Sequence, residues 1–140
     1  MAKEKSRNGK RWTEARFRSF IKGALRQTSR KWQPIGDCLK AARRGRGEYE
    51  CNGCGQVVPA TTKEGRTRVK NIHVDHIDPV IDPDIGFVDW DSVIERLFVE
   101  INKLQVLCSA CHTIKTNEEK SRAKTRRLKL KQEEEEDLDE

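Results

Sequence analysis

The chain has 140 residues, of which 34% are hydrophobic and 37% are charged, and its formal net charge is +6. Its length suits one domain with extensions, and the small share of hydrophobic residues predicts a small core, for which a structural metal is a common remedy. No apolar run approaches the about 20 residues of a membrane-spanning helix, and no secretory signal follows the N-terminus. We therefore expect a cytoplasmic protein with no membrane partner.

Basic residues are concentrated in the first third of the chain. Residues 1–46 contain 15 Lys or Arg against 3 Asp or Glu, whereas residues 131–140 contain 1 Lys against 7 acids. A basic surface of this kind is typical of proteins that bind nucleic acid, although it is also compatible with a merely solvated face.

Residues 1–11 are polar, basic and without periodicity, so we expect them to be disordered. Residues 12–46 are predicted to form a basic helical arm. Thr13 is a suitable N-cap for a first helix with an apolar stripe, and Pro34 suits the first turn of a second helix. This arm either clamps the DNA backbone or covers the cysteine-containing module that follows as a small helical cap. Its end carries the candidate DNA-binding residues Arg43, Arg44 and Arg46.

Four of the five cysteines occur in two C-x-x-C pairs with 53 residues between them. In an intracellular protein such pairs are typical of metal ligands rather than of disulfides. Zinc takes four thiolates in a tetrahedron, which leaves no open position for a substrate, so we predict a structural zinc ion whose binding contributes to folding. Gly53 and Gly55 are expected to supply positive φ in the first pair, and Cys38 to be a buried small hydrophobe. The predicted zinc ligands are Cys51, Cys54, Cys108 and Cys111.

The remaining elements are predicted from periodicity and capping signals. Alternating β-branched residues indicate strands, and Ser92 with Glu95 forms a capping-box signature at the start of a helix. The expected elements are a strand over 71–77, a helix over 92–102, a strand over 104–107 and a helix from Cys111 to about Lys131.

The acidic tail, residues 133–140, is a run of like charges and is predicted to be disordered. Such a tail either solubilises the end of the chain or folds back on the basic groove and competes with DNA. The four aspartates between residues 82 and 91 match no calcium-binding loop in their spacing.

Two stretches carry a more specific signal than the cysteine pairs alone. The first reads Val-Asp-His-Ile-x-Pro over residues 74–79, and the second reads Leu-Gln-Val-Leu-Cys-x-x-Cys-His-x-x-Lys-Thr over residues 104–116. With the two C-x-x-C pairs they resemble the HNH endonuclease family, and most closely the small HNH proteins of tailed bacteriophages. The resemblance covers residues 49–116. It implies an α+β fold with a zinc-stabilised ββα-metal nuclease domain over residues 47–120, preceded by the helical arm and followed over residues 121–140 by a basic helix extension and the acidic tail.

The resemblance also implies roles for single residues. His76 takes the place of the general base that activates water, and a neutral imidazole can accept a proton at cellular pH. Asp75 and His112 take the place of the ligands of one divalent ion, for which Mg²⁺, Mn²⁺ and Ni²⁺ are all suitable. Adjacent helical residues diverge by about 100°, so Cys111 can face the zinc while His112 faces the substrate groove. Lys115 is expected to bind DNA beside His112.

The middle residue of the motif is where this chain departs from the family. Asn commonly precedes the Leu-Gln of the second strand, but Lys103 stands there and Asn102 lies one residue earlier. Either Asn102 still orients His76 or the adjacent loop, or Lys103 contacts phosphate and the Asn role is unfilled. His73 is interpreted as a half-exposed strand histidine, with a contact to DNA or metal as the alternative.

These features predict a metal-dependent HNH endonuclease that hydrolyses phosphodiester bonds, nicking or cutting duplex DNA. The alternative is a zinc-stabilised DNA-binding or packaging accessory protein with a weakened or vestigial nuclease site. The resemblance implies a phage-encoded protein in the host cytoplasm, with DNA and the phage terminase or packaging proteins as partners.

Overall fold

The structure is a computed structural model that describes residues 2–139. The chain divides into two compact units, Met1–Trp32 and Gln33–Glu140, and each is described by itself. Residues 1 and 140, which belong to the expected disordered start and to the acidic tail, lie outside the described residues. The boundary between the units falls inside the expected arm 12–46, so the second predicted helix is in the same unit as the cysteine pairs.

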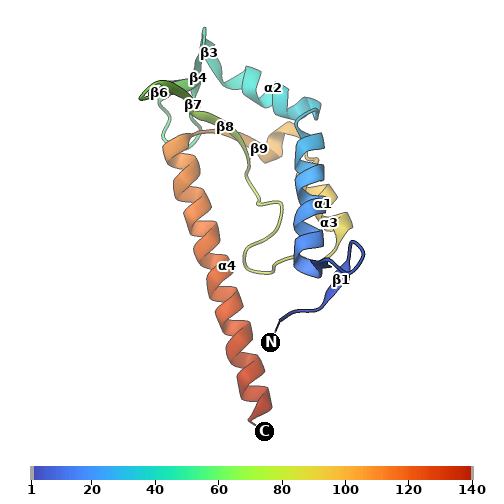
Figure 1. The fold of residues 1–140 in the computed structure, drawn as a ribbon. Coiled ribbons are helices and arrows are strands. Elements are labelled where there is room, and N and C mark those ends of the chain that lie inside the picture. Colours follow the sequence, from blue (N-terminus) through green and yellow to red (C-terminus); the bar gives the residue numbers. More distant parts are fainter. Residues whose placement is uncertain (1, 140) are drawn as a thin grey trace. The chain divides into compact units, whose positions relative to one another are not determined.

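The first unit contains a short hairpin followed by one helix. The predicted N-cap is confirmed, because Thr13 Oγ1 accepts a hydrogen bond from Arg16 N over 3.3 Å. The start of the chain, expected to be disordered, instead forms an antiparallel strand pair. Arg7 joins this pair to the helix that follows, since its guanidinium lies 2.8 Å from a carboxylate oxygen of Glu14 and 4.4 Å from the ring centroid of Phe17. The elements are β1 (Lys5–Arg7), β2 (Trp12–Thr13) and α1 (Glu14–Ser29) (Figure 1).

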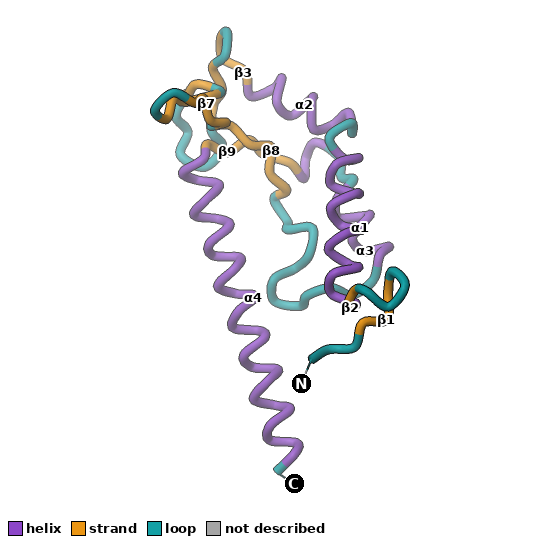
Figure 2. Tube along the Cα trace, in the orientation of Figure 1, coloured by secondary structure: helices purple, strands orange, loops and turns teal. Residues whose placement is uncertain are grey.

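The second unit combines three helices, one 3-10 turn and three small antiparallel sheets. Its strands form a three-stranded sheet in the order β3-β4-β5 and two strand pairs, β6-β7 and β8-β9. In chain order the elements are α2 (Gln33–Ala42), β3 (Arg43–Gly45), β4 (Glu48–Glu50), β5 (Val57–Pro59), β6 (Thr61–Glu64), β7 (Thr67–Lys70), β8 (Ile72–His76), α3 (Trp90–Leu97), η1 (Ile101–Lys103), β9 (Leu104–Cys108) and α4 (Ser109–Leu138) (Figure 2). The expected α+β class is therefore confirmed.

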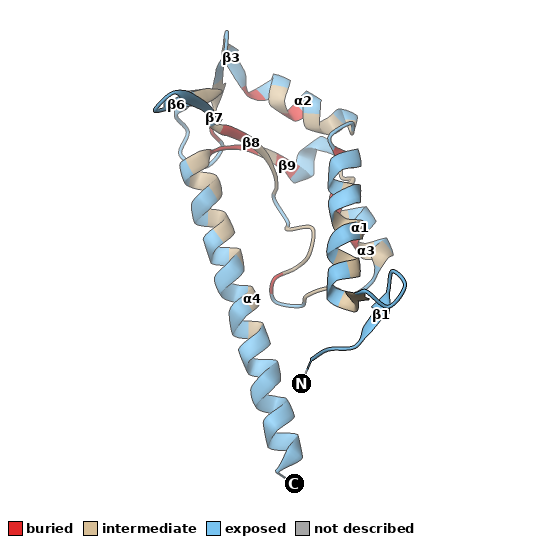
Figure 3. Cartoon of the chain, viewed as in Figure 1, coloured by how far each residue is buried: buried red, intermediate tan, exposed pale blue. Residues whose placement is uncertain are grey.

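The core of the second unit lies where α2 packs on the β8–β9 pair, as the buried segments in Figure 3 show. The prediction that Cys38 is a buried small hydrophobe is confirmed, and burial raises the pKa of its thiol. The buried members of this cluster are Cys38, Ala42, Ile72, Leu104 and Val106.

α3 begins and ends earlier than predicted. Its N-cap is Asp89, whose Oδ1 accepts a hydrogen bond from Ser92 N at 2.7 Å, so Ser92 lies within the first turn instead of capping it. Val93 and Leu97 are buried, but Ile94 and Ile101, which extended the apolar pattern, are 42% and 45% exposed. The helix predicted over 92–102 thus ends at Leu97, and the last two of its predicted residues lie in η1.

α4 begins before Cys111 and continues through the segment that was expected to be disordered. Lys, Arg, Glu, Gln and Leu are strong helix formers, which explains why a polar, charged sequence can extend the helix. Thirty residues correspond to about 45 Å of helix, and the acidic tail runs on along this axis. None of the helices in the described part of the chain is both long and apolar enough to cross a membrane.

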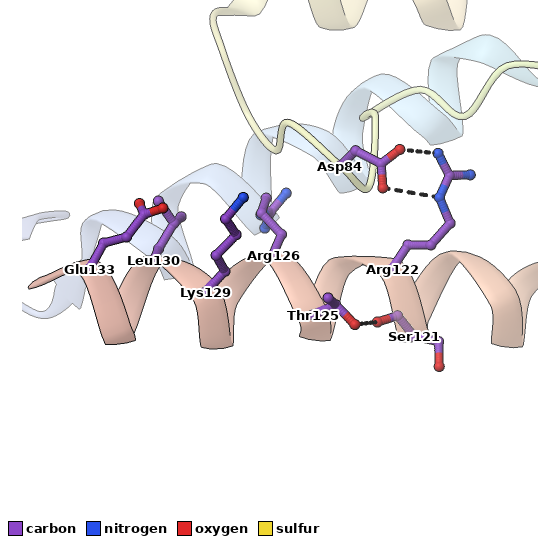
Figure 4. Close-up of a pocket in the computed structure, with 8 residues that line it drawn as sticks. All are labelled: Asp84, Ser121, Arg122, Thr125, Arg126, Lys129, Leu130 and Glu133. Atoms are coloured by element: carbon purple, nitrogen blue, oxygen red, sulfur yellow. Dashed lines mark hydrogen bonds and ion pairs between the residues drawn. The ribbon is translucent and has the colours of Figure 1, made fainter.

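The loop between β8 and α3 is fastened to the middle of α4. Arg122 forms a two-point ion pair with Asp84, and Arg126 Nη1 donates to the carbonyl of Pro83 at 3.3 Å (Figure 4). Gly86 has a φ of +86°, and a Cβ at this position would meet the Arg126 guanidinium. The loop aspartate is thus occupied by a salt bridge, which lowers the pKa of Asp84.

Replacing Val106 with Ala tests this description of the core. The side chain of Val106 is 0% exposed, so the cavity left by Val106→Ala should lower the free energy of unfolding by about 1–3 kcal/mol. Val57, 51% exposed in β5, is the matched control, and Val57→Ala should cost less than about 0.5 kcal/mol. Urea unfolding followed by circular dichroism measures both. Equal costs for the two substitutions would contradict the assignment of Val106 to the core.

Candidate functional site

The β8–β9 pair positions two polar clusters. Its register places Ile72 opposite Cys108 at one end and His76 opposite Leu104 at the other. Because successive side chains of a strand point to opposite faces, His73 and Asp75 share one face of β8, while His76 lies on the face that carries Ile72 into the core.

The first cluster consists of the four predicted zinc ligands. Their sulfur atoms all lie within 4.8 Å of one another. A tetrahedral zinc site with bonds of about 2.3 Å has sulfurs about 3.8 Å apart, so a small contraction accommodates the ion. The residues present fit a structural metal ion such as zinc. The ligands come from the turn after β4 (Cys51 and Cys54), from the end of β9 (Cys108) and from the first turn of α4 (Cys111).

Asn52 ties the first cysteine pair to β9. Its backbone N donates to the carbonyl of Val106, and its Oδ1 accepts from Val106 N, both over 2.7 Å. This two-point clamp holds the turn beside the strand that ends in Cys108. The sequence analysis missed Asn52; the only signal was an amide side chain between two cysteines, which by itself indicates no partner.

Gly53 and Gly55 are needed in this turn for different reasons. Gly55 has a φ of +73°, as predicted. Gly53 is required by close packing instead, because a Cβ there would lie 3.0 Å from the Cys111 sulfur and 3.2 Å from Cδ2 of Leu107.

Backbone amides already stabilise a thiolate in the cluster. Burial alone would raise the pKa of Cys51, but N–H donation from Cys108, Cys54 and Gly53 lowers it to about 6. The Gly53 and Cys108 nitrogens lie 3.3 and 3.2 Å from the Cys51 sulfur. Hydrogen bonds with the Cys108 and Cys51 sulfurs raise the pKa of Cys111 to about 12.

The second cluster is organised around Asp75, whose side chain is only 14% exposed. Its Oδ2 accepts from Gln105 Nε2 at 3.0 Å and lies 2.8 Å from Lys115 Nζ. Its other oxygen, Oδ1, lies 4.0 Å from His112 Nε2. Oδ1 of Asp75 and the ring of His112 therefore face each other across this gap. Gln105 was missed by the sequence analysis, although it stands directly opposite Asp75 in the strand register.

Lys115 is held by three acceptors of its own chain. Its Nζ donates to the main-chain oxygen of His76 at 2.7 Å and lies 2.8 Å from Asp75 and 2.9 Å from Glu119. Burial would lower the pKa of Lys115, but the two carboxylates raise it above its ordinary value, so the ammonium stays charged. One N–H of the ammonium is thus bound to a carbonyl, and two carboxylates lie within ion-pair distance of it. The structure therefore gives Lys115 a different set of contacts from the expected DNA phosphate.

His112 is packed against His73. The two rings are stacked at an interplanar angle of 15° with centroids 4.6 Å apart. His73 Nε2 lies 3.0 Å from Ser109 Oγ, which itself donates to the carbonyl of Lys70, so Nε2 of His73 carries the proton in this pair. Burial, His112 and Lys70 lower the pKa of His73. This strand histidine is half-buried and supports the ring of His112 from one side.

His76 points away from Asp75 and His112. Its Nε2 lies 2.8 Å from the carbonyl oxygen of Leu97, the last residue of α3. A carbonyl only accepts, so the neutral ring carries its proton on Nε2 and keeps the Nδ1 lone pair available. The contact also satisfies a carbonyl that has no partner within the helix.

The two residues considered for the middle position of the motif lie at the surface. Asn102 and Lys103 are both exposed in η1. The contacts expected of Asn102 come from other groups: Ile77 N donates to the Lys103 carbonyl at 3.0 Å, and Lys115 binds the His76 carbonyl. The Lys103 ammonium lies 3.8 Å from a carboxylate oxygen of Asp78.

The three arginines predicted to bind DNA lie in and after β3 and are exposed. Arg44 forms an ion pair with Glu50 and donates to the carbonyl of Ala41 at 2.9 Å. Arg43 Nε donates to the carbonyl of Gly45 at 3.2 Å. Arg46 lies in the turn between β3 and β4.

Comparisons of this chain with family models, with curated proteins and with solved structures found no match.

Elemental analysis of the purified protein tests the cysteine cluster. Four thiolates fill the four positions of one tetrahedral zinc site, so we expect about one zinc ion per chain. Cys111→Ser should lose most of this zinc and unfold at a lower temperature, because metal binding contributes to folding. Cys38→Ser is the matched control, since Cys38 belongs to the core cluster and not to the thiol cluster. A well-folded unmodified chain without metal would overturn the zinc site.

Proposed function

We propose that this protein is a metal-dependent DNA endonuclease of the HNH type, with a structural zinc ion in the cysteine cluster and a divalent ion between Asp75 and His112. The observation that carries the proposal is the geometry of Asp75. One carboxylate oxygen is held by Gln105 and Lys115, while the other faces His112 across 4.0 Å. A carboxylate oriented in this way leaves one oxygen for a metal ion.

His76 is the proposed general base. Its Nε2–H donates to the Leu97 carbonyl, which leaves Nδ1 to take a proton from the attacking water. When bound, the divalent ion would supply positive charge at the scissile phosphate and the leaving oxygen. In-line displacement puts the attacking and leaving oxygens on opposite sides of phosphorus.

The choice of DNA as substrate rests on charge. The chain has 29 Lys and Arg against 23 Asp and Glu, and Arg46 and Lys103 are exposed in turns of the second unit. Proteins with such surfaces bind the phosphate backbone without strong sequence preference. The resemblance to small phage proteins supports a phage-encoded enzyme that nicks or cuts DNA beside terminase or packaging proteins.

A second candidate is a zinc-stabilised DNA-binding or packaging accessory protein without cleavage activity. One observation favours it: Asn102 is exposed, and no side-chain amide takes the expected middle position. In that case the cysteine cluster and the basic surface retain their roles, whereas Asp75, His76 and His112 have none.

Nicking of supercoiled plasmid distinguishes these candidates. We expect the purified protein to convert supercoiled DNA to nicked or linear forms with Mg²⁺, Mn²⁺ or Ni²⁺. Loss of the general base in His76→Ala should reduce the rate by about 100-fold or more. Zinc content and circular dichroism should be the same in both proteins. A folded, zinc-loaded protein that is inactive with every metal would instead support the accessory role.

Gln105→Leu tests the orientation of Asp75 independently of cleavage. The substitution removes the N–H donor at 3.0 Å and keeps a side chain of similar size, so the affinity for Mn²⁺ should fall about 10–100-fold. Titration calorimetry of the zinc-loaded protein measures this, and zinc content should not change. Gln56→Leu, at an exposed position, is the control and should bind Mn²⁺ normally. Equal Mn²⁺ affinity of the two variants would show that Gln105 does not orient the ligand.

A further inference from the structure

The middle of α4 is densely basic. Seven of the twelve residues from 120 to 131 are Lys or Arg, and none is acidic. At about 100° per residue, these seven cations fall into two stripes on different faces of the helix. The clamped stripe consists of Arg122, Arg126 and Lys129, which lie along the recess beside the Asp84 loop (Figure 4). The outer stripe consists of Lys120, Lys124, Arg127 and Lys131.

The outer stripe is narrow and exposed. Its four positions fall within an arc of about 60°, and its centre lies about 160° round the helix from that of the clamped stripe. All four residues are exposed. Because Arg122 and Arg126 fasten the opposite face to the loop, the direction in which the outer stripe points is set by the fold.

We propose that the outer stripe binds the sugar-phosphate backbone of duplex DNA outside the cleavage site. This inference rests on the proposed DNA substrate. At about 1.5 Å of rise per residue, the stripe begins about 12 Å from His112 along the helix and ends about 28 Å from it. At about 3.4 Å per base pair, these distances correspond to phosphates about four to eight base pairs from the cut.

Charge density favours duplex DNA as the occupant. The stripe spans about 16 Å, and a duplex presents one negative charge per about 1.7 Å, so about ten phosphates lie within its reach. The acidic tail of a second copy is the other partner of complementary charge. Exposed ion pairs between proteins contribute only about 0–1 kcal/mol each, and paired helices need an apolar seam, which the four cations do not provide.

The salt dependence of DNA binding tests the proposal. Full-length protein carrying His76→Ala keeps the DNA intact, and fluorescence anisotropy with a labelled duplex of about 30 base pairs gives the dissociation constant over a range of NaCl concentrations. Each lost phosphate contact lowers the slope of log K against log salt by about 0.9. Replacing all four stripe residues with Gln, a comparable helix former, should lower the slope by about 3–4.

The sequence offers a matched control of identical composition. Each stripe residue is followed by an uncharged one, so exchanging the members of each pair turns the cations about 100° round the helix without changing the net charge. The exchanged pairs are Lys120 with Ser121, Lys124 with Thr125, Arg127 with Leu128 and Lys131 with Gln132. In this rotated variant the slope of log K against log salt should fall almost as much as in the Gln variant.

The outcomes separate this inference from the proposed function. Absence of DNA binding by the unmodified stripe would contradict the proposed function. Binding with an unchanged slope in the Gln variant would overturn the stripe alone. If the rotated variant bound DNA like the unmodified protein, the stripe proposal would also be overturned, because net charge alone would then explain DNA binding. If the Gln variant lost self-association in sedimentation but bound DNA unchanged, the stripe would instead be a contact with a second copy of the chain.

Discussion

The antiparallel pairing of β8 with β9 fixes the position of both polar clusters. In this register Asp75 stands opposite Gln105, and Cys108 lies at the opposite end of the pair. A slip of one residue would turn Asp75 and Gln105 to different faces and bring polar side chains into the core. The register is held by the burial of Ile72 and Val106 against α2, so core packing and the geometry of the candidate site depend on the same contacts.

The cysteine cluster adds the second constraint, because it joins the end of β9 and the start of α4 to a turn more than fifty residues earlier in the chain. Cys111 faces that cluster, and His112 diverges from it by about 100°. Stacking against His73 then holds the ring, and Ser109 holds His73. A metal ion bound by the four thiols would thus position a residue that does not contact it.

The cysteine pairs, the N-cap at Thr13 and the two central strands were predictable, because each depends on residues close in sequence or on a fixed spacing. The partners of Asp75 were not. Gln105 becomes a neighbour only through the strand register, and Lys115 only because α4 lies along β8, so neither contact has a local signal. The helical tail was missed for a different reason: a run of like charge indicated disorder, whereas intrinsic helix propensity continues α4 to Leu138.

The two clusters differ in the number of possible metal ligands that they bring together. Four sulfurs fill the coordination sphere of a tetrahedral ion, so the cysteine cluster has no position left for a substrate. Asp75 and His112 bring two possible ligands to face each other, and Lys115 neutralises part of the charge of Asp75 and Glu119. With so few protein ligands, the proposed divalent ion would keep open positions for water and a phosphate oxygen. The contact of Lys115 with Asp75 suits this proposal, because it holds one carboxylate oxygen and leaves the other facing His112.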